Sequence, residues 1–154
     1  MDDPIRRIRS VADYQFGLGV GERLFPDNVQ IEYSRATGRI RYVNLQGERL
    51  ATLRPTDGLF CISIKAARIL KETLTSKLHC LVTVRQDVAK YIAEGGDVFA
   101  AHVVAADEEI HAKEEVIAID EAGEVLAVGR AMLSAEEMNA FKTGVAVKVR
   151  HGNC

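Results

Sequence analysis

Apolar positions at the start of the chain recur with the period of a helix. One face of this expected helix carries Ile5, Ile8, Ala12 and Phe16. Asp2 or Asp3 can cap it, with Pro4 at the first helical position, where a missing N–H is tolerated. The glycine-rich run 17–21 follows a helix rather than a strand, so it favours a helix stop over a phosphate-binding loop. We expect an N-terminal helix that packs by one apolar stripe.

Alternation of apolar and polar side chains replaces the helical period between residues 29 and 53. Three short runs there are separated by Thr37-Gly38 and Gln46-Gly47, pairs that are typical of hairpin turns. The pattern predicts three antiparallel strands joined by two hairpins. Residues 55–58 then form a turn, in which proline and glycine occupy favourable places.

A second helical period runs over residues 63–76, with an apolar inner face and charged residues outside. The short polar run 75–77 at its end is the candidate domain boundary, which predicts domains over 1–77 and 78–154. The first domain is expected to be a small α+β domain, an antiparallel sheet with helices, so the fold class is α+β.

In the second domain, residues 81–85 predict a strand, and a short helix follows that Gly95 ends as its left-handed residue. Residues 125–133 are nearly all apolar, which is typical of a strand covered on both faces. Gly129 interrupts this run and indicates a bulge or a close approach of another backbone.

The last thirty residues predict a helix followed by a strand. Ser134 and Glu137 have the spacing of a capping box, so a helix is expected to begin there and to end at Gly144. Alternation then predicts a strand over 145–150, with one buried face and one face that carries positive charge.

Five ordered blocks of the second half resemble the PUA domain: Gly95 to Ala100, Val116 to Asp120, Val128 to Ala131, Ser134 to Met138 and Gly144 to Val147. PUA domains are small β pseudo-barrels found in pseudouridine synthases and archaeosine transglycosylases, and as a family they bind structured RNA. The resemblance implies a pseudo-barrel over 78–154 that binds RNA.

The first half has a resemblance of its own, to the small domain that precedes PUA in archaeal tRNA-guanine transglycosylase. It rests on the blocks Ile8 to Gly17, Leu24 to Pro26, Ser34 to Arg41 and Leu53 to Phe60. With both halves in the same order, essentially the whole chain resembles the C-terminal portion of that enzyme. The catalytic barrel of the family has no counterpart in these 154 residues.

The resemblance implies an RNA groove formed by the glycine loop, the strand that follows it and the last strand. Its residues are Gly95, Gly96, Phe99, Ala100, His102, Lys148, Arg150 and His151. Glycines let a phosphate or ribose approach the backbone, and Lys and Arg form charge-assisted bonds to phosphate. Two of these residues also have ordinary structural interpretations, since Gly95 ends a helix and Phe99 fits a hydrophobic core.

A second basic cluster, Arg35, Arg39 and Arg41, falls around the first hairpin turn. A charge cluster of this kind is either a solvated hairpin tip or an edge that contacts phosphate.

Charge limits where RNA can bind. The formal net charge of −2 argues against a polycation that coats nucleic acid indiscriminately. Residues 1–79 hold 13 Lys and Arg against 9 Asp and Glu, whereas residues 80–154 hold 7 against 13. The half that resembles an RNA-binding domain is therefore the acidic half, and any RNA-binding face has to be local.

Composition and cysteine usage indicate an ordinary globular protein. The hydrophobic fraction is 47%, and no apolar run approaches the roughly 18 residues of a membrane span. Cys61, Cys80 and Cys154 are odd in number and far apart, which favours neither a disulfide framework nor a metal site. The N-terminus lacks the basic and apolar regions of a signal peptide, so we expect a cytoplasmic location without a membrane partner.

No catalytic residues, metal ligands or cofactor-binding motif are predicted. The histidines lie without ligand spacing at His79, His102, His111 and His151. The acidic pairs are paired only by adjacency, as in solvated turns.

Three functions remain open at this point. The first is a non-catalytic RNA-binding module, with structured RNA and above all tRNA as its partner, in an archaeosine-type modification system. The second is a subunit that docks substrate for a separately encoded transglycosylase or related enzyme. The third is a protein-interaction adaptor without RNA affinity, suggested by the acidic second half.

Overall fold

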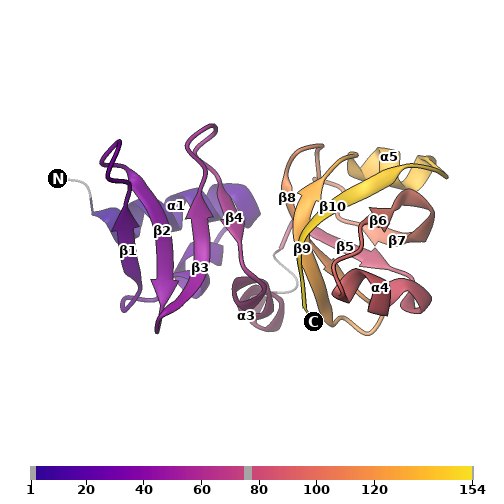
Figure 1. Ribbon diagram of the computed structural model, residues 1–154, viewed down its shortest axis with the longest axis horizontal. Helices are drawn as coiled ribbons and strands as arrows, with labels where there is room; N and C mark the ends of the chain where they lie inside the picture. The colour runs from indigo at the N-terminus through magenta and orange to yellow at the C-terminus, as the bar shows by residue number, and fades with distance from the viewer. Residues whose placement is uncertain (1–2, 75–77, 154) are drawn as a thin grey trace. The chain divides into compact units, whose positions relative to one another are not determined.

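The computed structural model describes residues 3–74 and 78–153 (Figure 1). The chain divides into two compact units, Met1–Leu78 and His79–Cys154. Each unit has its own core of buried aliphatic and aromatic side chains. The predicted boundary run 75–77 lies outside the described residues.

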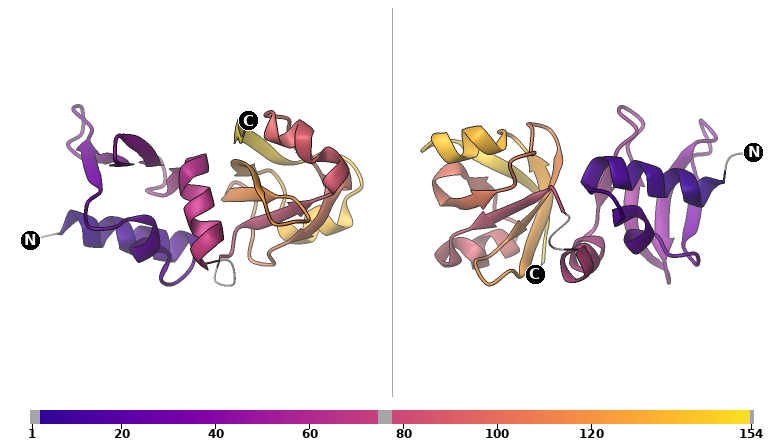
Figure 2. Two further views of the ribbon diagram at one scale, coloured as in Figure 1. Left: turned by 90° about the horizontal axis from the view of Figure 1, so that it is seen from below. Right: turned by 180° about the vertical axis from the view of Figure 1, so that it is seen from behind.

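The first unit is an antiparallel sheet with helices on one face. Its strand order is β1-β2-β3-β4, and the strands are Gln30–Tyr33, Ile40–Leu45, Glu48–Leu53 and Phe60–Ile62. The helices are α1 (Pro4–Phe16), α2 (Val20–Leu24) and α3 (Ile64–Leu74). Viewed from behind, α1 crosses the face of the sheet (Figure 2). Helix α2 packs on α1, and α3 packs on α2 and β3.

The sequence patterns of this unit are confirmed in their main features. Asp3 caps α1 by accepting a hydrogen bond from the Ile5 N–H at 3.1 Å, and Pro4 occupies the first turn. The three predicted strands and both hairpins are present. The second hairpin turns through Gln46 and Gly47, both with positive φ, as a two-residue turn of this hand requires.

Two elements of the first unit are missing from the sequence prediction. Strand β4 has three residues and helix α2 has five, so neither is long enough to establish a period. Tertiary packing forms both. Phe60 of β4 lies against Phe25 with ring centres 5.2 Å apart, and a Cβ on Gly21 of α2 would lie 2.2 Å from the Arg9 carbonyl oxygen.

The second unit is a nearly closed β-barrel, which confirms the expected pseudo-barrel. Its strand order is β6-β10-β9-β8-β5-β7. The strands are β5 (Leu81–Val84), β6 (Val98–Phe99), β7 (Val103–Ala106), β8 (Glu115–Ile119), β9 (Val125–Ala131) and β10 (Val145–Gly152). Strands β5 and β8 are parallel, and the other pairs are antiparallel. Helix α4 (Ala89–Ala93) packs on β9 and β10, and α5 (Ala135–Ala140) packs on β7.

Strand β9 shows why the run 125–133 is so apolar. All its residues except Arg130 are buried. A Cβ on Gly129 would lie 2.2 Å from the Lys148 carbonyl oxygen, so the glycine permits a close approach of β10.

The helix after β9 begins as predicted and ends earlier. The capping box is complete, since Ser134 Oγ accepts from the Glu137 N–H and Glu137 Oε1 accepts from the Ser134 N–H. The prediction that Gly144 ends this helix is wrong: α5 ends at Ala140. Gly144 instead takes a φ of +93° in the loop before β10, where its carbonyl accepts from the Ala100 N–H at 2.9 Å.

Candidate nucleic-acid interface

Gly95 and Gly96 follow α4 and form a glycine elbow. The hydrogen bonds that end this helix fix its conformation. The Gly95 N–H donates to the Ile92 carbonyl at 2.9 Å and the Gly96 N–H donates to the Tyr91 carbonyl at 3.0 Å, the pair of bonds that defines a Schellman cap. Gly95 has a φ of +106° and is exposed. A Cβ on Gly96 would lie 2.2 Å from the ring of Tyr91, an exposed side chain, so a larger residue there would displace this ring.

The last strand runs beside this elbow. Strand β6 pairs with β10 through Val98 and Val147. Asp97 Oδ1 accepts a hydrogen bond from the Val149 N–H at 2.9 Å. A Cβ on Gly152 would lie 2.3 Å from the Ala93 carbonyl oxygen, so the end of β10 lies directly against the end of α4. The predicted elbow and the predicted strand are therefore adjacent.

A row of two cations, Lys148 and Arg130, lies on one face of the barrel next to the glycine elbow. Lys148 of β10 is directly opposite Arg130 of β9, and opposite residues of an antiparallel pair share a face. The Lys148 side chain is 69% exposed, and its Nζ lies 3.6 Å from Asp97 Oδ2. Arg130 is exposed and has no ion pair with any residue in the described part of the chain. Sequence reasoning missed Arg130, although it is the one exposed position in an otherwise buried strand.

Arg150 is held in a different way. Its guanidinium forms a two-pronged ion pair with Glu115 of β8, with Nη1 at 2.8 Å from Oε1 and Nη2 close to Oε2. Glu115 is 3% exposed. Because this carboxylate neutralises Arg150, the residue ties β10 to β8 and brings less charge to a ligand than Lys148 does.

The other predicted groove residues differ in how accessible they are to a ligand. Phe99 is 37% exposed and meets the His102 ring edge-on, with ring centres 6.1 Å apart. His151 is exposed on β10. Ala100 is 3% exposed and its N–H is bonded to Gly144, so neither its side chain nor its amide is available to a ligand.

The second predicted cluster lies on the first hairpin of the other unit. Arg35 and Arg39 are exposed, whereas Arg41 is half-buried, with its guanidinium 5.5 Å from the centre of the Tyr42 ring. A further cation that the sequence did not single out, Arg49, stacks on the same ring at 3.7 Å.

Two ionisable groups of the second unit have displaced pKa values without forming a reactive site. Burial raises the pKa of the Asp107 carboxyl, against the opposing effect of a hydrogen bond from the Leu81 N–H. Burial also raises the pKa of the Cys80 thiol far above its usual range, and the carboxylates of Asp107 and Glu115 add to this. Across residues 3–74 and 78–153, no three His, Cys, Asp or Glu side chains are grouped to hold a metal ion.

Comparison with known proteins agrees with this architecture. Residues 81–152 match the PUA domain. Residues 6–77 match the patch-forming domain C2 of tRNA-guanine transglycosylase. Its order of domains, C2 followed by PUA, is that of the C-terminal part of archaeal tRNA-guanine transglycosylases, to which this chain is related.

The relatives are considerably longer than the matched region. The chain is 39% identical over 150 residues to the tRNA-guanine(15) transglycosylase of Methanobrevibacter smithii. It is 41% identical over 150 residues to that of Methanothermobacter thermautotrophicus. Each alignment covers 97% of this chain and 23% of the relative, so the chain spans about a quarter of these curated relatives.

Solved structures share the fold over nearly the whole chain. A hypothetical protein of Pyrococcus horikoshii superposes with a TM-score of 0.74 at 24% identity, covering 96% of this chain and 89% of that one. A conserved PUA domain protein of Thermoplasma acidophilum superposes with a TM-score of 0.66 at 20% identity, covering 96% and 86%. No helix in the described part of the chain is long and apolar enough to span a membrane.

Proposed function

We propose that this protein is a cytoplasmic RNA-binding module of a tRNA-modification system of the archaeosine type, without catalytic activity of its own. Its ligand is structured RNA, with tRNA as the first candidate. The backbone of the RNA lies against Gly95 and Gly96 and along the cations of β9 and β10, and Phe99 and His151 border the contact.

One observation carries this proposal: an exposed glycine elbow lies beside exposed cations in a unit that is acidic as a whole. Asp97 joins the elbow to β10 next to Lys148, and Arg130 extends the row to β9. Phosphate contacts fix a protein on a nucleic acid without reading its sequence, which suits a docking role. The names of the relatives, which are tRNA-guanine(15) transglycosylases, support tRNA as the ligand.

A binding experiment with a tRNA transcript tests the proposal. The transcript is titrated with the protein at several salt concentrations, and contact with about four phosphates predicts a log-log slope of about −3 to −4. The variant R130E/K148E is expected to weaken binding at least tenfold and to flatten the slope. R23E is the control, because Arg23 is an exposed arginine of the other unit.

The result that contradicts the proposal is the absence of tRNA binding at low salt. Binding that R130E/K148E leaves unchanged also contradicts the assigned face. Either outcome would favour the adaptor function suggested by the acidic second half.

A second function is suggested by the similarity to tRNA-guanine(15) transglycosylases. In it, the protein docks tRNA for a transglycosylase-type catalytic subunit. A pull-down with such an enzyme followed by a base-exchange assay tests this, and an exchange rate that the added protein does not change would argue against it.

A further inference from the structure

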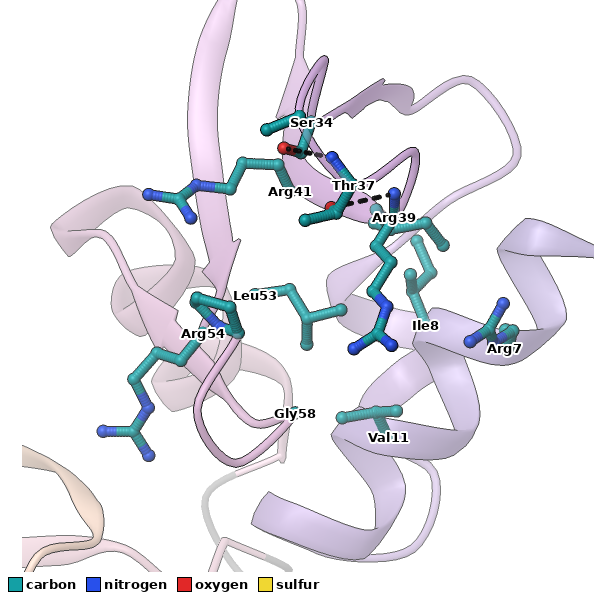
Figure 3. A pocket seen from close by; sticks show the side chains of 13 residues that line it. Arg7, Ile8, Val11, Ser34, Thr37, Arg39, Arg41, Leu53, Arg54 and Gly58 are labelled. Atoms are coloured by element: carbon teal, nitrogen blue, oxygen red, sulfur yellow. Dashed lines mark hydrogen bonds between the residues drawn. The ribbon is translucent and has the colours of Figure 1, made fainter.

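A cavity of about 540 Å³ lies within the first unit, apart from the interface described above (Figure 3). Three segments enclose it: helix α1, the hairpin turn between β1 and β2, and the turn between β3 and β4. Its volume falls in the range of about 300 to 1,000 Å³ that is typical of small-molecule sites.

The charged residues of this cavity are all arginines. Arg7, Arg39, Arg41 and Arg54 line it, and no Asp or Glu does so among the described residues. Arg54 is neutralised by Asp57, with Nη2 at 2.8 Å from Oδ2. Arg7 and Arg39, in contrast, have no ion pair within residues 3–74 and 78–153.

The side chains of these four arginines point in different directions (Figure 3). The Arg39 side chain extends from the first turn into the space between the sheet and α1, and Arg7 borders the same space from the helix. Arg41 and Arg54 point to the other side. Two guanidinium groups without carboxylate partners therefore face the cavity.

The inner wall of the cavity is apolar. It is formed by Ile8 and Val11 of α1, Ile40 of β2 and Leu53 of β3. Ile8 and Ile40 are buried, whereas Val11 and Leu53 are half-buried and leave apolar surface within reach of a ligand. A simple inorganic anion would leave this apolar wall exposed to water. A purely apolar ligand would leave the guanidinium groups of Arg7 and Arg39 without hydrogen-bond acceptors.

The two turns that carry the rim are built alike and are internally bonded. In the first, the Ser34 N–H donates to the Arg39 carbonyl at 2.7 Å and the Gly38 N–H donates to the Ser34 carbonyl at 2.8 Å. In the second, the same two bonds join Arg54 with Leu59 and Gly58 with Arg54, at 2.8 and 3.0 Å. Binding therefore does not have to order the rim, which favours affinity.

Hydroxyl groups add polar contacts at the first turn. Ser34 Oγ accepts from the Thr37 N–H at 3.4 Å, and Thr37 Oγ1 accepts from the Arg39 N–H at 3.3 Å. Each hydroxyl still has its own proton, which it can donate to a ligand oxygen.

We propose that this cavity binds a single nucleotide, with its ring against the apolar wall and its phosphate on Arg7 and Arg39. A guanidinium group matches phosphate with parallel hydrogen bonds. The same chemistry is offered by a free nucleotide and by one nucleotide unstacked from an RNA strand. The site is distinct from the interface on the second unit, so the two proposals can be tested independently.

Calorimetric titration of the whole protein tests this site. The probes are the four nucleoside monophosphates, the matching nucleosides, inorganic phosphate and a single-stranded trinucleotide. A monophosphate is expected to bind at least tenfold more tightly than its nucleoside and than inorganic phosphate. The nucleoside lacks the phosphate that pairs with the arginines, and inorganic phosphate lacks the ring that packs on the apolar wall. A trinucleotide that binds more tightly than the monophosphate identifies RNA as the source, whereas equal affinity identifies a free nucleotide.

Two variants of different kinds locate the site. R39A removes charge from an exposed position and is expected to weaken monophosphate binding at least tenfold. V11F fills the apolar wall without changing charge and is expected to abolish it. R23A is the matched control, since Arg23 is exposed and does not line the cavity. Circular dichroism of each variant checks that it is folded.

Three outcomes would overturn the proposal. They are the absence of binding by any monophosphate or the trinucleotide, inorganic phosphate binding as tightly as a monophosphate, and binding that R39A and V11F leave unchanged. None of them affects tRNA binding at Lys148 and Arg130, which R130E/K148E tests separately.

Discussion

Asp97 Oδ1 accepts a hydrogen bond from the Val149 N–H at 2.9 Å, and this bond joins residues 52 positions apart. The register of β10 against β6 shifts between Val145 and Val147, and its register against β9 shifts between Val149 and His151. The carboxylate thus satisfies a strand amide between these two irregularities, beside the elbow. The shape of the candidate interface therefore depends on Asp97.

We predict that D97A destabilises the second unit by about 1 to 3 kcal/mol, because it leaves a part-buried amide without its acceptor. D97N keeps an acceptor oxygen and loses only the exposed ion pair with Lys148, so its loss is expected to be below about 1 kcal/mol. Urea unfolding measures both losses, and hydrogen exchange of the Val149 amide reports the local effect. Equal losses in the two variants would contradict this role.

Gly129 gives a steric prediction. An alanine Cβ there would lie 2.2 Å from the Lys148 carbonyl oxygen and 2.9 Å from the Val149 Cα, so β9 and β10 have to separate. We expect G129A to cost at least about 1 to 3 kcal/mol, as overpacking does, and to perturb NMR signals along β10. In G144A the new methyl meets open space, and only the φ of +93° opposes it. A G129A protein that melts at the wild-type temperature would refute the close approach.

The raised pKa of Asp107 leads to a prediction about how the stability of the protein depends on pH. Its pKa is raised in the folded protein, chiefly by burial, so the folded state binds this proton more readily than the unfolded chain does. The resulting stabilisation is complete below the unfolded pKa, about 3.9, and is lost as the pH rises through the folded pKa. D107N removes this dependence and keeps an oxygen for the Leu81 N–H.

The free energy of unfolding of D107N relative to wild type should therefore increase from acid to neutral pH and then become constant. Urea unfolding between acid and neutral pH measures the difference. The exposed carboxylate Glu124 supplies the control variant E124Q. A difference that decreases as the pH rises would contradict the assigned direction.

Cys80 is expected to be unreactive in the folded protein. Burial raises the pKa of its thiol far above the usual range, and the thiolate is the form that alkylating reagents attack. We predict that iodoacetamide at mildly alkaline pH leaves Cys80 unmodified in the native protein and modifies it after denaturation. Mass spectrometry of the peptide that contains Cys80 distinguishes the two states. Rapid modification in the native protein would show that this position opens to solvent.

Local features were predictable from the sequence because each depends on neighbours a few residues apart. The cap at Asp3, the hairpin turn at Gln46-Gly47, the helix end at Gly95 and the capping box at Ser134 are of this kind. The close approach at Gly129 was one of two expected alternatives, and its partner strand was not predictable. The PUA fold followed from a resemblance over five ordered blocks, and the structural and family matches confirm it.

Only the tertiary structure decided which charges are available. Lys148 and Arg150 are two positions apart, yet Arg150 is bound to Glu115, 35 residues away, and Lys148 extends beside Asp97. Arg130 joined the row because β9 pairs with β10, and Arg7 lines the same cavity as Arg39 because α1 and the hairpin turn both border it. The amino-acid sequence alone therefore determined the caps and tight turns, since short-range spacing encodes them, and its resemblance to the PUA domain indicated the fold of the second half. The partners of each cation depend on contacts between distant segments, which only the folded chain establishes.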